Sequence, residues 1–96
     1  MTKDIFESPF LFKRWCSKLR STWSLDTETN SLKYLDLELI GFSICDGKQA
    51  CYVNILPEYK QELLDILAFY IQEAKMIVMH NSPFDMAVLR KEGVEI

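Results

Sequence analysis

The sequence has little of what disulfide frameworks and zinc sites require. Its 96 residues include three cysteines (Cys16, Cys45 and Cys51) and a single histidine, His80. The number of cysteines is odd and no two of them form a Cys-x-x-Cys pair, so neither a disulfide framework nor a thiolate zinc site is indicated. We therefore expect free thiols and a reducing, cytoplasmic compartment.

Long apolar runs and an excess of glycine or proline are also missing. No run approaches the roughly 18 to 20 apolar residues that span a bilayer, and the N-terminus has no continuous apolar signal region. The composition, 49% hydrophobic and 26% charged with three Gly and three Pro, excludes disordered and fibrous classes. We expect one packed, soluble domain at most, with no membrane partner.

A uniformly basic surface, which is the usual footprint of nucleic-acid binding, is absent too. The net charge is −3, but residues 1–20 carry five Lys or Arg against two acids, and residues 21–96 carry six against twelve. This asymmetry predicts an N-terminal amphipathic helix or arm over residues 1–20, attached to an acidic body. Two ordinary solvated faces are the alternative interpretation.

The apolar periodicity predicts alternating helices and strands. Ser8 as the cap and Pro9 at the first position predict a helix over residues 8–21, and residues 21–27 are typical of a strand. Asp46-Gly47 lies between two apolar runs and predicts a hairpin with a two-residue turn. That register sets Cys45 opposite Lys48 and Cys51 opposite Phe42, so these cysteines are not bonded to each other.

The second half of the chain predicts a helix, a strand and a helix. Apolar residues at helical spacing predict a helix over residues 57–75 with one buried face. The run 76–81 is typical of a parallel strand covered on both faces. Ser82 as the cap, Pro83 at the start and Gly93 at the end predict a final helix. The whole order predicts an α/β fold with a mixed sheet.

Two carboxylates in "LDTETNSL", Asp26 and Glu28, follow an apolar run at a spacing of two residues. In an extended strand they share one face with Cα atoms about 7 Å apart. Oxygen ligands of this kind suit Mg²⁺ or Mn²⁺. The alternative is a turn approach with solvated acids, and Asp36 and Glu38 repeat the spacing ten residues later. A metal site therefore needs a third acid from elsewhere.

Asp85 in "HNSPFDMAVL" is the candidate for that third acid, since it begins a helix directly after a buried strand. The alternative interpretation is a helix cap, because Ser82 and Asp85 have nearly the spacing of a capping box. His80 and Asn81, taken alone, are typical of a strand end and a turn. Each of these motifs is ambiguous by itself.

Together, "LDTETNSL", "LELIGFSICDGKQACYVNI" and "MHNSPFDMAVLRKEGVEI" resemble the first two motifs of the 3′–5′ proofreading exonuclease domain of family A DNA polymerases. That domain belongs to the DnaQ-like, ribonuclease H-like exonucleases, and the resemblance covers residues 22–96. It implies a ribonuclease H-like mixed sheet, in which a three-strand antiparallel meander and a parallel strand are flanked by helices. The chain ends before the family's last strand and helix.

The resemblance also implies roles for single residues. Asp26, Glu28 and Asp85 match acids that bind two Mg²⁺ or Mn²⁺ ions and serve catalysis. Three other residues match positions that hold the 3′-terminal nucleotide of a single DNA strand; they are Thr29, Leu32 and Asn81.

The family's fourth acid, and the Tyr or His that precedes it, have no counterpart in residues 1–96. We therefore expect an incomplete exonuclease domain over residues 21–96, inactive as the isolated chain unless a C-terminal segment or a polymerase domain supplies the missing motif. The alternatives are a non-catalytic remnant that binds a nucleic-acid end or a partner, and a fragment of an RNase D-like exoribonuclease.

Overall fold

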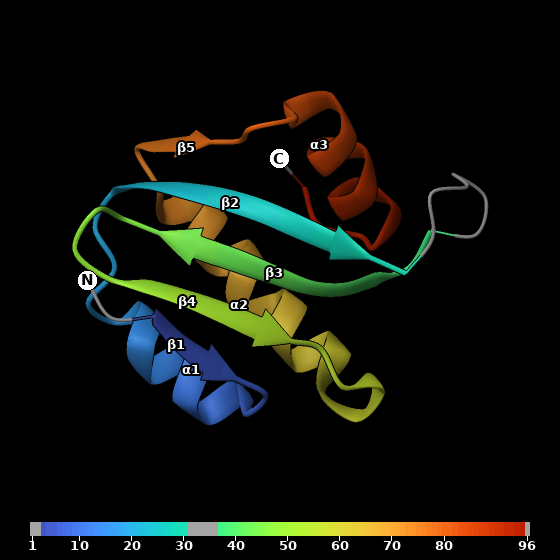
Figure 1. Ribbon diagram of the computed structural model, residues 1–96, viewed down its shortest axis with the longest axis horizontal. Helices are drawn as coiled ribbons and strands as arrows, with labels where there is room; N and C mark the ends of the chain where they lie inside the picture. Colours follow the sequence, from blue (N-terminus) through green and yellow to red (C-terminus); the bar gives the residue numbers. More distant parts are fainter. Residues whose placement is uncertain (1–2, 31–36, 96) are drawn as a thin grey trace.

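The computed structural model describes residues 3–30 and 37–95, which form a five-stranded sheet with three α-helices (Figure 1). The strand order is β1-β4-β3-β2-β5. β2 pairs antiparallel with β3 and β3 with β4, whereas β1 and β5 pair parallel with β4 and β2. The elements are β1 (Lys3–Phe6), α1 (Pro9–Cys16), β2 (Thr22–Thr29), β3 (Leu39–Cys45), β4 (Ala50–Asn54), a 3₁₀ turn η2 (Pro57–Tyr59), α2 (Lys60–Glu73), β5 (Met76–Val78) and α3 (Ser82–Lys91). The predicted α/β class and mixed sheet are confirmed.

Strand β1 was not expected from the sequence. It adds a second parallel strand to the predicted meander and places Lys3 beside Ala50 and Phe6 beside Val53. The following helix α1 begins as predicted, since the Ser8 hydroxyl accepts the Leu11 N–H at 3.3 Å, but it ends at Cys16. Residues 3–16 thus belong to the same sheet and core as the rest; the domain boundary at residue 20 remains a prediction.

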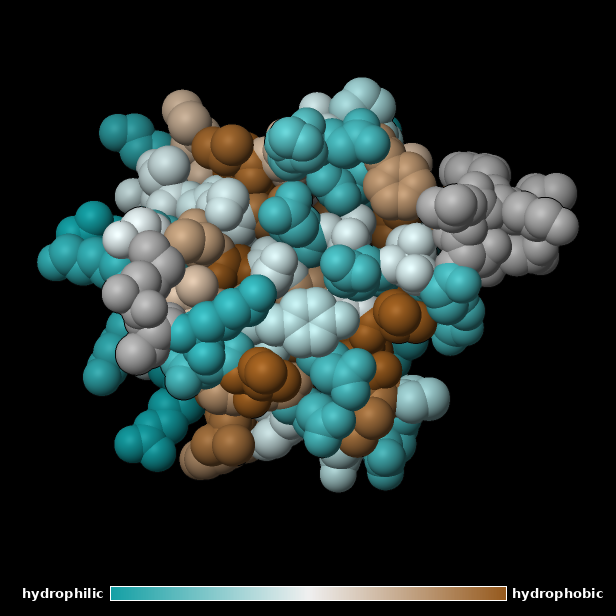
Figure 2. Space-filling model, viewed as in Figure 1, coloured by the Kyte–Doolittle hydropathy of each residue, from teal (hydrophilic) through white to brown (hydrophobic). Residues whose placement is uncertain are grey.

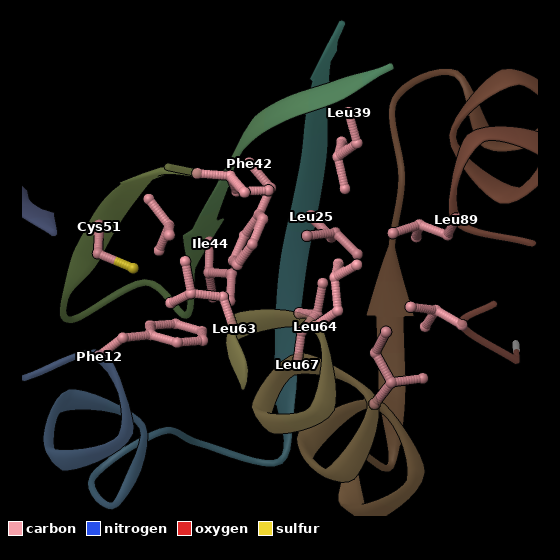
Figure 3. Close-up of a cluster of buried hydrophobic side chains, with 14 of the residues drawn as sticks. Phe12, Leu25, Leu39, Phe42, Ile44, Cys51, Leu63, Leu64, Leu67 and Leu89 are labelled. Carbon is pink, nitrogen blue, oxygen red and sulfur yellow. The ribbon is translucent and has the colours of Figure 1, made fainter. Parts of the chain in front are cut away.

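The core lies between one face of the sheet and the helices (Figure 3). Helices α1 and α2 cover this face, and α3 lies at the carboxyl end of β2 (Figure 1). Alternate residues of the strands point into the core, where the Phe12 and Phe42 rings meet edge to face with centroids 5.4 Å apart. The largest fully buried side chains are Phe12, Phe42, Leu25, Leu39, Ile44, Leu63, Leu67, Leu89, Val53, Cys16 and Cys51. The sheet face that the helices cover is therefore the apolar one.

The hairpin between β3 and β4 has a different register from the predicted one. Cys45 lies opposite Ala50 and Cys51 opposite Ile44, so the turn contains four residues and not two. The reason is the side chain of Asp46, whose Oδ1 accepts the N–H groups of Lys48 and Gln49 at 2.9 Å. The register moves by two residues, which leaves the predicted faces of the strands unchanged.

Cys16, Cys45 and Cys51 form no disulfide bond. The pKa of the Cys51 thiol is raised to about 12, and the pKa of the Cys16 thiol is raised well above its usual range. Burial is the main cause of both shifts.

Strand β5 and helix α3 correct two further expectations. β5 is an edge strand with Met76 58% and Val78 52% exposed, so it is not covered on both faces. Asn81, not Ser82, occupies the N-cap position of α3, without a side-chain capping bond. Gly93 ends this helix as predicted: its φ is 88°, and the next N–H, of Val94, donates to Leu89 O at 2.9 Å.

On the opposite face of the sheet, no helix formed by the described residues is present (Figure 1). We call this face the open face. It presents side chains of β2, β3 and β4 that alternate with the core residues, and its surface is a mixture of hydrophilic and hydrophobic patches (Figure 2). Within the described part of the chain, no helix is long and apolar enough to cross a membrane.

Candidate active site

Asp26 and Glu28 lie on the open face near the end of β2. The strand continues to Thr29, so both residues have extended geometry and their side chains share one face, with both residues exposed. Asp26 is paired with Ser43 of β3 and Glu28 with Gly41, and a bulge follows between Glu28 and Thr29. The two carboxylates therefore share one face of an extended strand, as their spacing predicts.

Asp85 lies in the first turn of α3 and is 4% exposed. Its Oδ1 accepts the Thr27 hydroxyl at 2.6 Å and the Thr27 N–H at 3.3 Å. β5 pairs with β2 only up to Ser24. The Asp85 carboxylate therefore accepts a hydrogen bond from a β2 N–H that lies beyond the end of β5. The carboxylate therefore bonds a residue outside its own helix, which a capping role would not explain.

The three candidate carboxylates thus lie along one segment of β2, with Asp26 and Glu28 on the open face and Asp85 at the strand edge. The Thr27 N–H belongs to the peptide unit that follows Asp26, and Asp85 is bonded to that unit at the edge of the strand. Asp26 itself points to the open face. Within residues 3–30 and 37–95, however, no group of three or more His, Cys, Asp or Glu side chains is close enough to hold a metal ion.

The chemistry of this donor set nevertheless fits a hard divalent cation. Mg²⁺ and Mn²⁺ take carboxylate oxygens and keep several waters or substrate oxygens as further ligands, so they need no complete cage of protein side chains. Asp26, Glu28 and Asp85 are the residues that would hold such an ion.

The predicted substrate residues are only partly described. Thr29 is the last residue of β2 and is half-buried, and Asn81 is exposed at the start of α3. The Asn81 carbonyl accepts the Asp85 N–H at 2.9 Å, so Asn81 is fixed to the third acid by one helical turn. Leu32 lies outside the described residues. The assignment of these residues to a substrate remains a prediction.

Two other acids that could compete for the role have different partners. Glu38, from the duplicate doublet, is exposed and lies 3.6 Å from Lys60 Nζ, whereas Asp36 is outside the described residues. Glu92 forms an ion pair with Lys60 at 2.7 Å and accepts the Leu39 N–H at 3.1 Å. Glu92 therefore ties the end of α3 to the start of α2 and of β3.

Two residues near the carboxylates were missed in the sequence. Thr27, between the two acids, holds Asp85. Tyr52 lies on the open face, two strands away from Asp26. The pKa of its phenol is raised, mainly by burial and to a smaller extent by the negative charge of Glu28. The sequence did contain a sign of Tyr52, because a glycine inside a strand, here Gly41, often marks close approach of another group.

Comparison with known protein families identifies the family of the chain. Residues 4–96 match the family model described as 3′–5′ exonuclease, that of the family A DNA polymerases. The chain belongs to this family. As a 3′–5′ exonuclease domain of the polymerase type, it has a fold of the ribonuclease H-like kind and a nucleic acid as the substrate of its family. No curated protein matches the chain.

Proposed function

We propose that this 3′–5′ exonuclease domain acts on single-stranded DNA ends in the manner of a proofreading nuclease, with Mg²⁺ or Mn²⁺ bound by Asp26, Glu28 and Asp85. The observation that supports it best is the bond between Asp85 and Thr27, which are 58 residues apart. It supports the choice of Asp26 and Glu28, because the residue between them holds the third candidate acid. Bound divalent ions supply charge stabilisation for the phosphodiester oxygens and lower the pKa of the attacking water.

The residues of the chain would divide the work by position. Asp26 and Glu28 would present oxygen ligands near the end of β2, and Thr27 holds Asp85 at the strand edge. Thr29, Leu32 and Asn81 would contact the 3′-terminal nucleotide, with Leu32 as an apolar wedge beside the base.

The 96 residues offer no counterpart of the family's fourth acid. We infer that the chain alone binds the ion weakly and hydrolyses DNA slowly or not at all, and that a C-terminal segment or a polymerase domain completes the site. A missing first-sphere carboxylate should weaken metal binding by at least the 10- to 100-fold that loss of an outer-sphere partner costs. Three cysteines outside disulfide bonds favour a reducing compartment such as the cytoplasm.

Titration calorimetry with Mn²⁺ tests the metal assignment. Wild-type chain should bind Mn²⁺ weakly, and Asp26→Ala should bind it at least tenfold more weakly, because the carboxylate that Asp26 contributes is gone. Asp36→Ala is the matched control from the duplicate doublet and should bind as the wild type does. Equal binding by wild type and Asp26→Ala, or loss in Asp36→Ala alone, would refute the assignment.

Hydrolysis is tested on a chain extended by the last strand and helix of a related exonuclease. The extended chain should shorten a 5′-labelled single strand from its 3′ end, and Asp26→Ala should abolish this, because two-metal catalysis depends on the fixed positions of its ligands.

A second candidate function is binding of a nucleic-acid end without catalysis. It is favoured by the absence, within the described residues, of a three-ligand cluster. Binding of the strand without shortening by the extended chain would support it.

A further inference from the structure

One row of residues crosses the open face beside the candidate site. Glu28 of β2 is paired with Gly41 of β3, and Gly41 is paired with Asn54 of β4. The next row contains Asp26, Ser43 and Tyr52 in the same order. Tyr52 is therefore separated from Asp26 by one strand, and its side chain rises from the same face as both carboxylates.

Gly41 is buried although it lies on the open face, and Tyr52 is the reason. A Cβ atom on residue 41 would overlap the Tyr52 hydroxyl, would lie 2.6 Å from Tyr52 Cζ, and would lie 2.9 Å from the Val53 carbonyl oxygen. The phenol thus leans along the sheet and ends above the Cα atom of Gly41. Any other residue at position 41 would push the ring away.

This position brings the phenol oxygen to the row of residues that contains Glu28. Gly41 and Glu28 are directly opposite each other on adjacent strands, where Cα atoms are about 5 Å apart. A glutamate side chain that stands on this face therefore reaches the space above Gly41. A phenol is a hydrogen-bond donor and a carboxylate accepts only, so the two groups are complementary.

We propose that Tyr52 is a positioning residue for Glu28: its hydroxyl donates a hydrogen bond to the Glu28 carboxylate and holds it on the open face beside Asp26, and Gly41 leaves the room for the ring. The inference rests on the proposed function of Glu28 as a metal ligand. An exposed glutamate samples several rotamers, so a fixed donor reduces the entropy that ion binding would cost.

Nuclear magnetic resonance on the ion-free chain tests the contact itself. In protein labelled with ¹³C at the tyrosine ε carbons, Tyr52→Phe identifies the Tyr52 signal. Glu28→Gln should move that signal, because the charged acceptor is replaced by a neutral amide. Asp65→Asn, which removes a charge from the exposed side of α2, should leave it in place. An unmoved Tyr52 signal in Glu28→Gln would overturn the inference.

Mn²⁺ affinity tests the consequence. Tyr52→Phe keeps the ring and loses the hydroxyl, and we expect about 10-fold or more weaker binding. Tyr59→Phe, on η2, is the matched control and should bind as the wild type does. In the Glu28→Gln background Tyr52→Phe should cause no further loss, because the hydroxyl acts through Glu28. An equal loss in both backgrounds would overturn the inference.

The two experiments separate this inference from the proposed function. If wild-type chain binds no Mn²⁺, the metal assignment fails, while the tyrosine signals still decide whether Tyr52 contacts Glu28. If the chain binds Mn²⁺ through Asp26 but the Tyr52 signal ignores Glu28, the proposed function stands and the role of Tyr52 is wrong.

Discussion

The Thr27 residue holds Asp85, the proposed third acid of the site, at the edge of β2. Asp85 is almost completely buried, and burial of a carboxylate is tolerated only where donors compensate for the lost water. Thr27 provides both donors that contact Oδ1, one from its side chain and one from its backbone. One small residue between two acids thus connects β2 with α3.

Thr27→Val keeps the shape of the side chain and removes the hydroxyl. Because the buried Asp85 carboxylate loses a donor, we expect the free energy of unfolding to fall by about 1–3 kcal/mol. Thr27→Ser retains the hydroxyl and should lose less. Urea denaturation followed by far-ultraviolet circular dichroism measures both variants. A Thr27→Val chain as stable as the wild type, or one more stable than Thr27→Ser, would show that the bond contributes nothing.

At the level of elements, the Asp46 side chain organises the turn between β3 and β4. It accepts the N–H groups of Lys48 and Gln49 in the turn and, through Oδ2, the Arg20 N–H at 3.1 Å. The last bond attaches the connection between α1 and β2 to the hairpin. Burial raises the pKa of Asp46, but the hydrogen bonds from Gln49, Lys48 and Arg20 outweigh it, and the net pKa lies below the ordinary value of 3.8.

A lowered pKa makes the contribution of Asp46 to stability depend on pH. The ionised carboxylate is favoured in the folded state, so its contribution is complete above pH 3.8 and is lost as the pH falls below that value through the folded-state pKa. Asp46→Asn should be less stable than the wild type at pH 7, with a difference that shrinks as the pH falls below about 4. The exposed Asp65→Asn serves as control. A difference that stays constant down to pH 2 would contradict the prediction.

The elements with local signals could be predicted from the sequence, and those that depend on distant partners could not. Ser8 and Pro9 specify the start of α1, and Gly93 specifies the end of α3, because caps act within one turn. β1 is four residues long and finds its partner 47 residues later, so no local pattern reveals it. The hairpin register was missed because the side chain of Asp46, and not the Asp-Gly dipeptide alone, sets the turn.

In the candidate site too, features set by local geometry could be predicted from the sequence, and those that depend on distant partners could not. The spacing of Asp26 and Glu28 predicts a shared face of one strand, and that is a property of local geometry. The partner of Asp85 depends on where β5 ends relative to β2, which only the folded sheet determines. The position of the Tyr52 hydroxyl depends on a glycine in the neighbouring strand.

For the molecule as a whole, the edge of the sheet at β5 exposes apolar side chains to solvent. β5 forms one edge, and Met76 and Val78 expose apolar side chains there. An edge strand with apolar residues favours pairing with another chain. We therefore expect the chain to associate at high concentration.

Val78→Lys should reduce this association, because a charge at an edge strand opposes pairing. Phe69→Lys is the control: Phe69 is equally apolar and is 54% exposed, but it lies on α2, away from the edge. Sedimentation velocity over a range of concentrations measures both variants. Association that persists in Val78→Lys and disappears in Phe69→Lys would place the contact on the helices.

The pairing of β1 with β4 has a consequence for the order of events on the ribosome. Lys3 pairs with Ala50, so the first strand leaves the ribosome before its partner has been made. At synthesis rates of about 5–20 residues per second, those 47 positions correspond to a delay of roughly 2–10 s. A hairpin such as β3–β4 forms within about 1–10 μs. The nascent chain therefore closes its central hairpin almost at once, and its N-terminal segment, although synthesised first, joins the sheet only after that hairpin exists.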